Sequence, residues 1–91
     1  MIVTKKVIIS GRVQGVFYRM SAKQKAENIG ITGWVKNRSD GRVEAIFQGY
    51  SKKVDEMIKW CYMGPSLSKV ENVDIEDVIE AKIFDEFKIK Y

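Results

Sequence analysis

The nine residues GRVQGVFYR, residues 11–19 of this 91-residue chain, join a predicted strand to a predicted helix. Into this stretch runs an alternation typical of a strand, with Val7, Ile9, Gly11 and Val13 on one face. A helical pattern begins at Arg19. Such a turn directs successive backbone N–H groups into one concavity, and the helix N-terminus adds unpaired donors with a positive partial charge. These features favour a phosphate-sized anion, and Arg19 can hold two of its oxygens with one planar guanidinium.

Two other phosphate motifs are excluded here. A Walker loop has the form GxxxxGK[ST], and no Lys-Ser or Lys-Thr follows Gly11 or Gly15. A cysteine phosphatase loop of the form Cys-x5-Arg would place its nucleophile at Val13. Because strand-to-helix turns with glycine are often only connections, the local pattern alone is weak evidence. If the turn is a site, it works without a protein thiolate.

Residues 11–19 also resemble the acylphosphatase signature GxVQGVxFR, with Tyr18 where that family usually has Phe. Residues 33–44, GWVKNRSDGRVE, are similar to the family's second block, GWVxNxxDGxVE. Gly64-Pro65 followed by Val70 and Val73 resembles a third. The blocks occur in family order and spacing and span nearly the whole chain. The resemblance implies one acylphosphatase-like domain, residues 1–91.

The resemblance implies hydrolysis of acyl phosphates to a carboxylate and inorganic phosphate, with no cofactor and no metal. In the family, the residue matching Asn37 positions the water that attacks in line, and the arginine matching Arg19 holds the phosphate. Main-chain amides of the turn complete the expected substrate-binding set: Gln14, Gly15, Val16, Phe17, Tyr18 and Arg19. The expected partners are a small acyl phosphate and inorganic phosphate, which is both product and competitive inhibitor. We expect a monomer that binds neither nucleic acid nor membrane.

Composition narrows the classes of function. The chain has no histidine, which counts against zinc sites, Ser-His triads and histidine acid–base chemistry. Its one cysteine, Cys61, rules out an internal disulfide. The formal charge of +4 suits anionic partners but says little alone. Residues 1–6 lack the apolar run of a signal peptide, and no stretch approaches membrane-spanning length. These features predict a cytoplasmic protein.

Periodicity and turn signals predict seven elements. They are strands over 2–13, 31–37, 41–49, 68–78 and 87–91, the last a short fifth strand, and helices over 19–29 and from 51 to about 63. Gly30 is expected to cap the first helix, Ser51 to be the N-cap of the second, and Gly64-Pro65 to end it. A bulge is expected between Val70 and Val73.

The order of the first six elements is β-α-β-β-α-β. Two right-handed split βαβ units give an antiparallel sheet in the order 4-1-3-2 with both helices on one face, which is the ferredoxin-like α+β sandwich. Strands 2–13 and 31–37 then run the same way and end at the same edge, two strand spacings or roughly 10 Å apart. Arg19 and Asn37 are therefore expected to face one site.

The remaining notable residues have structural interpretations. Asp40, in the Arg38-Ser39-Asp40-Gly41 hairpin, is expected to stabilise the turn. Trp34 and Trp60 are interpreted as packing or surface aromatics. The expected inward residues are Val43, Ala45 and Phe47 on the third strand and Val54, Met57, Ile58 and Cys61 on the second helix.

Two rival functions remain open. RNA-recognition domains share this element order but need exposed aromatics on the central strands, and the outward set of the third strand is a poor stacking surface: Arg42, Glu44, Ile46 and Gln48. A non-catalytic anion- or RNA-binding module is therefore the alternative. Acylphosphatase-like domains also occur at the N-terminus of hydrogenase maturation proteins, for which the sequence offers no further domain.

Overall fold

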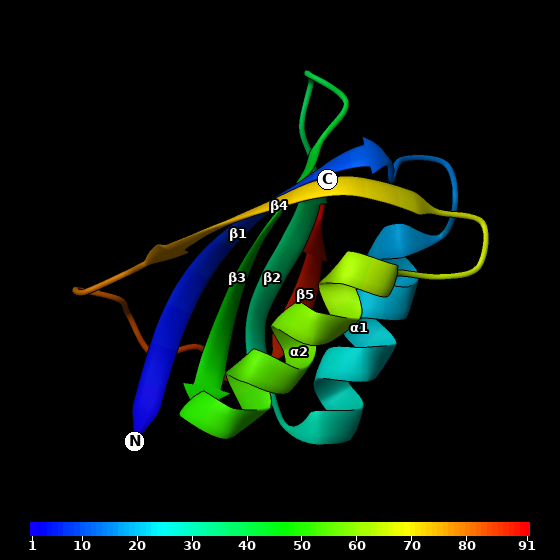
Figure 1. Cartoon of the computed structure of the whole chain (residues 1–91). Helices are drawn as coiled ribbons and strands as arrows, with labels where there is room; N and C mark the ends of the chain where they lie inside the picture. Colours follow the sequence, from blue (N-terminus) through cyan, green and yellow to red (C-terminus); the bar gives the residue numbers. More distant parts are fainter.

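The computed structural model describes all 91 residues as one sheet covered on one face by two helices (Figure 1). The elements are β1 (Ile2–Arg12), α1 (Tyr18–Ile29), β2 (Thr32–Asn37), β3 (Val43–Tyr50), α2 (Ser51–Met63), β4 (Lys69–Asp77) and β5 (Phe87–Lys90). α1 packs on β2 and β5, and α2 packs on β1, β3 and β4. The ferredoxin-like sandwich is confirmed, with observed boundaries one or two residues from those predicted.

The sheet order is β4-β1-β3-β2-β5, which confirms the predicted 4-1-3-2 core and adds the fifth strand beside β2. The first three pairings are antiparallel, but β5 runs parallel to β2, so the sheet is mixed rather than wholly antiparallel. The connection from β4 to β5 passes from one edge of the sheet to the other. Gln48 fastens it, donating from Nε2 to the carbonyl of Lys82 at 2.9 Å and accepting at Oε1 from the N–H of Phe84 at 2.9 Å.

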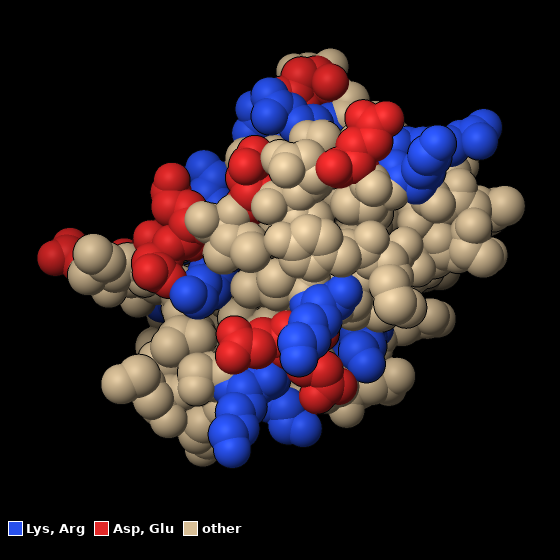
Figure 2. All heavy atoms as spheres, viewed as in Figure 1, with Lys and Arg blue, Asp and Glu red and all other residues tan.

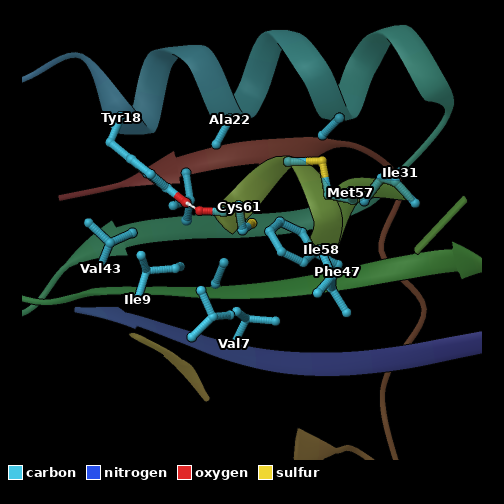
Figure 3. Packing of buried hydrophobic residues seen from close by; sticks show 14 of the residues in the cluster. Val7, Ile9, Tyr18, Ala22, Ile31, Val43, Phe47, Met57, Ile58 and Cys61 are labelled. Carbon is cyan, nitrogen blue, oxygen red and sulfur yellow. Dashed lines mark hydrogen bonds between the residues drawn. The ribbon is translucent and has the colours of Figure 1, made fainter. Parts of the chain in front are cut away.

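The core lies between the sheet and the helices (Figure 3). Alternation places Val7 and Ile9 of β1 in it. Every side chain predicted to point inward from the third strand and the second helix is buried there: Val43, Ala45, Phe47, Val54, Met57, Ile58 and Cys61. Phe87 of β5 stacks on Phe47 with ring centroids 5.9 Å apart. This contact fixes β5 against the core and so positions the end of the chain.

Two local predictions have different outcomes. Ser10 pairs with Asn72 while Gly11 pairs with Val70, so Glu71 is the extra residue of a β-bulge, as predicted between Val70 and Val73. The prediction that Ser51 is the N-cap of α2 is wrong. Tyr50 is the N-cap, without a side-chain cap, because the extended chain continues through it and the N–H of Ser51 pairs with the carbonyl of Met1.

No helix is both long and apolar enough to cross a membrane. On the side seen in Figure 2, acidic and basic side chains are interspersed, both along the edges and in a cluster in the lower centre, with uncharged surface between them.

Candidate active site

Residues 13–17, which we name the anion loop, join β1 to α1. Gly15 has φ +74° and Phe17 has φ +67°, so two of its five residues are in the left-handed region. A left-handed residue other than glycine costs about 1–2 kcal/mol, and such strain persists where the surrounding structure holds it. The N–H groups of residues 14–17 donate to no protein acceptor. The loop therefore presents unused donors next to the N-terminus of α1.

A cavity of about 260 Å³ opens beside this loop. Arg19 and Asn37, eighteen positions apart in the sequence, both line it, as the topology predicted. The other lining residues come from the loop, from α1 and from the end of the chain: Val13, Gly15, Phe17, Tyr18, Met20, Ile89 and Tyr91. Arg19 is its only lining residue with a charged side chain, and that charge is positive, which suits the cavity to an anion.

The Arg19 side chain forms no ion pair with a carboxylate. Its guanidinium carbon lies 5.1 Å from the centre of the Tyr91 ring, a cation–π distance. The stacked ring restrains the guanidinium without neutralising it. Arg19 thus keeps its N–H donors for a ligand in the cavity.

Asn37 is the last residue of β2. Its side-chain oxygen Oδ1 is buried and accepts no hydrogen bond from the protein. A buried acceptor without a donor costs about 1–3 kcal/mol, so a site that keeps one has a use for it. An amide oxygen can accept a hydrogen bond from a water molecule without adding negative charge.

Gln14 and Val16, two other members of the expected binding set, do not line the cavity. The side-chain Nε2 of Gln14 donates to the carbonyls of Arg38 at 2.8 Å and Arg42 at 2.9 Å. It fastens the anion loop to the β2–β3 hairpin directly after Asn37. Val16 is buried in the core. Only the main chain of these two residues remains for a ligand.

Tyr18, which departs from the family's usual Phe, anchors the loop to α2. Its hydroxyl donates to the carbonyl of Cys61 at 2.8 Å (Figure 3). In a continuing helix that carbonyl would accept from residue 65, and Pro65 has no N–H. The ring packs on Trp60 at 5.3 Å, and a Cβ at Gly64 would lie 2.8 Å from it. The tyrosine hydroxyl therefore satisfies a carbonyl that the proline leaves unpaired.

The remaining reactive groups are unsuited to catalysis. Burial raises the pKa of the Cys61 thiol to about 12, which keeps it protonated at neutral pH. Burial likewise raises the pKa of the Tyr18 hydroxyl above its ordinary value. No three His, Cys, Asp or Glu side chains are grouped as metal ligands.

Asp40 stabilises its turn, as predicted. Its carboxylate accepts from Arg38 Nε at 3.1 Å, from Arg42 Nε at 3.1 Å and from the backbone N–H of Arg42 at 3.1 Å. The hydrogen bond from Arg38, followed by that from the Arg42 N–H, lowers the pKa of Asp40 to about 2. Both hairpin arginines therefore already donate hydrogen bonds to a carboxylate of the protein.

The sequence interpretation missed four lining residues: Val13, Met20, Ile89 and Tyr91. The alternation of the final strand places Ile89 and Tyr91 on one face, but their approach to Asn37 depends on the parallel pairing of β5 with β2. Had that pairing been anticipated, the end of β5 would have been expected beside the end of β2.

Comparisons with known proteins show the family of the chain. The family model described as Acylphosphatase matches residues 5–89. The acylphosphatase of Rubrobacter xylanophilus is 51% identical over 72 residues, which are 79% of this chain and 66% of that protein. That of Methylococcus capsulatus is 45% identical over 83 residues, 91% of this chain and 90% of the relative. The crystal structure of acylphosphatase from Bacillus subtilis superposes with a TM-score of 0.94 at 32% identity, with both chains fully covered. The chain belongs to the acylphosphatase family of hydrolases.

Proposed function

We propose that this protein hydrolyses the carboxyl–phosphate bond of small acyl phosphates, without a metal or cofactor and without a covalent intermediate. Arg19 and the main-chain amides of residues 14–18 hold the phosphoryl group, and Asn37 positions the attacking water. The enzyme acts as a cytoplasmic monomer that needs neither nucleic acid nor membrane. Its substrate is a small acyl phosphate, and inorganic phosphate is the product and a competitive inhibitor.

The proposal rests on one observation: two residues that line the same cavity each have a polar group without a partner in the protein. Arg19 is a cation without a carboxylate partner, and Asn37 Oδ1 is a buried acceptor without a donor. A phosphate bound by the first and a water bound by the second would satisfy both. The two groups come from different elements, so phosphate and water can lie side by side.

The chemistry needs little more than these groups. The leaving group is a carboxylate whose conjugate acid has a pKa of about 4, so it departs without a general acid. Phosphoryl transfer passes through a transition state with charge spread over the phosphoryl oxygens. Arg19 and the loop amides stabilise that charge. Asn37 keeps the water opposite the leaving carboxylate, which converts a random encounter into an aligned attack.

Steady-state hydrolysis of acetyl phosphate, with and without excess chelator, tests this function. We expect turnover that the chelator leaves unchanged and that inorganic phosphate inhibits competitively. Loss of turnover with chelator, restored by a divalent ion, would contradict the proposed mechanism. Absence of turnover in a folded protein that still binds phosphate would favour the non-catalytic anion-binding module, and binding of single-stranded RNA measured in parallel would favour the RNA-binding one.

A further inference from the structure

Strands β2 and β5 carry different side chains on their two faces because alternate residues point to opposite sides of a sheet. Val35 is buried, Ile89 packs against the core, and Asn37 lines the candidate active site. The intervening residues lie on the face away from the helices, which we name the open face. On that face the register pairs Trp34 with Lys88 and Lys36 with Lys90. These four residues form what we name the indole–lysine cluster.

The lysines of this cluster rest on the indole. The Nζ of Lys90 lies 4.5 Å from the centre of the Trp34 ring, and that of Lys36 lies 5.4 Å from it. Neither ammonium has a carboxylate within ion-pair distance. Lys88 pairs with Glu86 at 3.7 Å, and both side chains are 65% exposed, so water weakens that pair. The cluster therefore carries positive charge that the protein does not neutralise.

A second cavity of about 260 Å³ adjoins the cluster. Trp34 and Lys90 line it on the strand side. The connection between β4 and β5 lines the other side with Lys82 and Phe84, whose Nζ and ring centre are 5.3 Å apart. Gln48 and the hydrogen bond from the N–H of Gly33 to the carbonyl of Glu86 hold this connection in place. Lys88 is the third lysine that lines the cavity, and Asp85 and Glu86 line it as well, so basic side chains exceed acidic ones by one. Glu86 faces Lys88, which leaves Lys82 and Lys90 as the lysines next to the two aromatic rings.

We propose that this cavity is a second anion site and that it binds a free nucleoside polyphosphate. Lysines are common point-charge ligands of phosphate. A cation–π contact at an exposed site contributes about 0.5–1 kcal/mol, whereas stacking of a base on an aromatic side chain contributes about 1–3 kcal/mol. The phosphates draw the ammonium groups of Lys36 and Lys90 off the ring, and the base stacks on the freed indole of Trp34.

The charge distribution of the open face selects a short ligand. Following the register across the sheet, Lys36 is succeeded by Glu44, Ile8 and Asp74, and Trp34 by Ile46, Lys6 and Glu76. The face thus becomes acidic toward β4. A polynucleotide laid across it would meet these carboxylates, while a single nucleotide fits within the positive half.

Titration with magnesium-free ATP, followed by the amide and indole N–H resonances of the ¹⁵N-labelled full-length protein, tests the site. At low ionic strength, where screening is weak, we expect saturable shifts of the Trp34 indole and of residues 33–36 and 86–90. Trp34→Ala should weaken binding by about tenfold, while Trp34→Phe, which keeps a ring, should retain most of it. Lys36→Gln/Lys90→Gln removes two surface charges and should also weaken binding by about tenfold, even if Trp34→Ala fails to fold.

Lys52→Gln/Lys53→Gln on α2 is the charge-matched control and should leave ATP binding unchanged. Each of several results would overturn the site. The first is a set of shifts confined to residues 14–19 and 37, or no shifts at all. The second is equal weakening of ATP binding by the two double charge variants. The third is binding of inorganic triphosphate as tight as that of ATP, or binding of a single-stranded oligonucleotide but not of ATP. The site lies outside the candidate active site, so its failure leaves the proposed hydrolase activity untouched.

Discussion

Two arginine-bearing loops of this protein lie next to each other and have opposite hydrogen-bonding states. In the β2–β3 hairpin, Arg38 and Arg42 donate to Asp40, and Arg38 also pairs with Glu44 at 3.3 Å. In the anion loop and the first turn of α1, Arg19 has only the Tyr91 ring. The hairpin satisfies its own charges, and the anion loop leaves a cation and a row of N–H groups unused.

This difference separates a structural role from a binding role. An arginine paired with carboxylates holds a turn together and has little capacity left for a ligand, because its planar donors are already directed. An arginine without such a partner in a cavity keeps that capacity. Gln14 connects the two regions, so the structural loop fixes the position of the binding loop.

The largest expected effect comes from Arg19. Arg19→Ala should lower kcat/KM for acetyl phosphate by about 10³-fold or more, because transition-state charge loses its main counterion. Arg19→Lys should recover little, since an ammonium cannot reproduce the two-oxygen fork. Steady-state kinetics, with circular dichroism to verify folding, measures both. Near-wild-type turnover in the lysine variant would show that charge alone suffices.

Asn37→Ala should reduce kcat and kcat/KM alike, by about 10²–10³-fold, because the water loses its fixed position mainly in the transition state. Asn37→Asp should do no better, since a carboxylate repels the anionic substrate. Inhibition by inorganic phosphate should stay near its wild-type strength in the alanine variant. A collapse of phosphate affinity with kcat preserved would assign Asn37 to the phosphate cradle instead.

Gln14→Ala should have an intermediate effect, because it removes the hydrogen bonds that join the anion loop to the β2–β3 hairpin. Loss of two hydrogen bonds should lower the free energy of unfolding by about 1–3 kcal/mol. Displacement of the loop from Asn37 should lower kcat by about tenfold. Gln14→Glu, similar in shape but without the donor, should be at least as damaging, because its carboxylate would face two carbonyl oxygens and add negative charge to the anion loop. Denaturant unfolding measures the stability of each variant, and steady-state kinetics measures its kcat. A loss of stability with unchanged kcat would show that Gln14 has a structural role only.

The smallest effect is expected in the hairpin itself. The pKa of Asp40 is lowered from 3.8 to about 2, so the carboxylate's contribution to stability is complete above pH 3.8 and disappears as the pH falls through 2. The difference in unfolding free energy between wild type and Asp40→Asn should therefore be constant from neutral pH to about pH 4 and shrink below it. Urea unfolding across this range measures the difference. A gap that stays unchanged down to pH 2 would show that the ion pairs do not stabilise the hairpin.

Much of the fold could be predicted because its determinants are local. Alternation identified the strands, Gly30 and Gly64 ended the helices, and the bulge was visible in the changed spacing between Val70 and Val73. The parallel position of β5 could not be predicted, since it depends on the long connection that Gln48 fastens. From the sequence Gln48 was an outward polar residue, yet it is buried under that connection.

The candidate site likewise has features that the sequence could predict and features that it could not. The meeting of Arg19 and Asn37 followed from topology alone, because two parallel strands separated by one antiparallel strand end at the same edge. The left-handed conformation of Phe17 and the use of the Gln14 side chain as a fastener have no local signal. Tyr91 entered the cavity only through the strand pairing that the sequence did not reveal.

Direct titration of inorganic phosphate into Arg19→Ala and Arg42→Ala, followed by backbone amide resonances, tests the contrast between the two loops most directly. Both variants lose one positive charge from neighbouring loops, and neither measurement requires turnover. We predict that Arg42→Ala binds phosphate as the wild type does, with shifts at residues 14–19, and that Arg19→Ala loses at least about tenfold in affinity. Equal weakening in both variants, or unchanged binding in Arg19→Ala, would contradict the assignment of the anion site to Arg19.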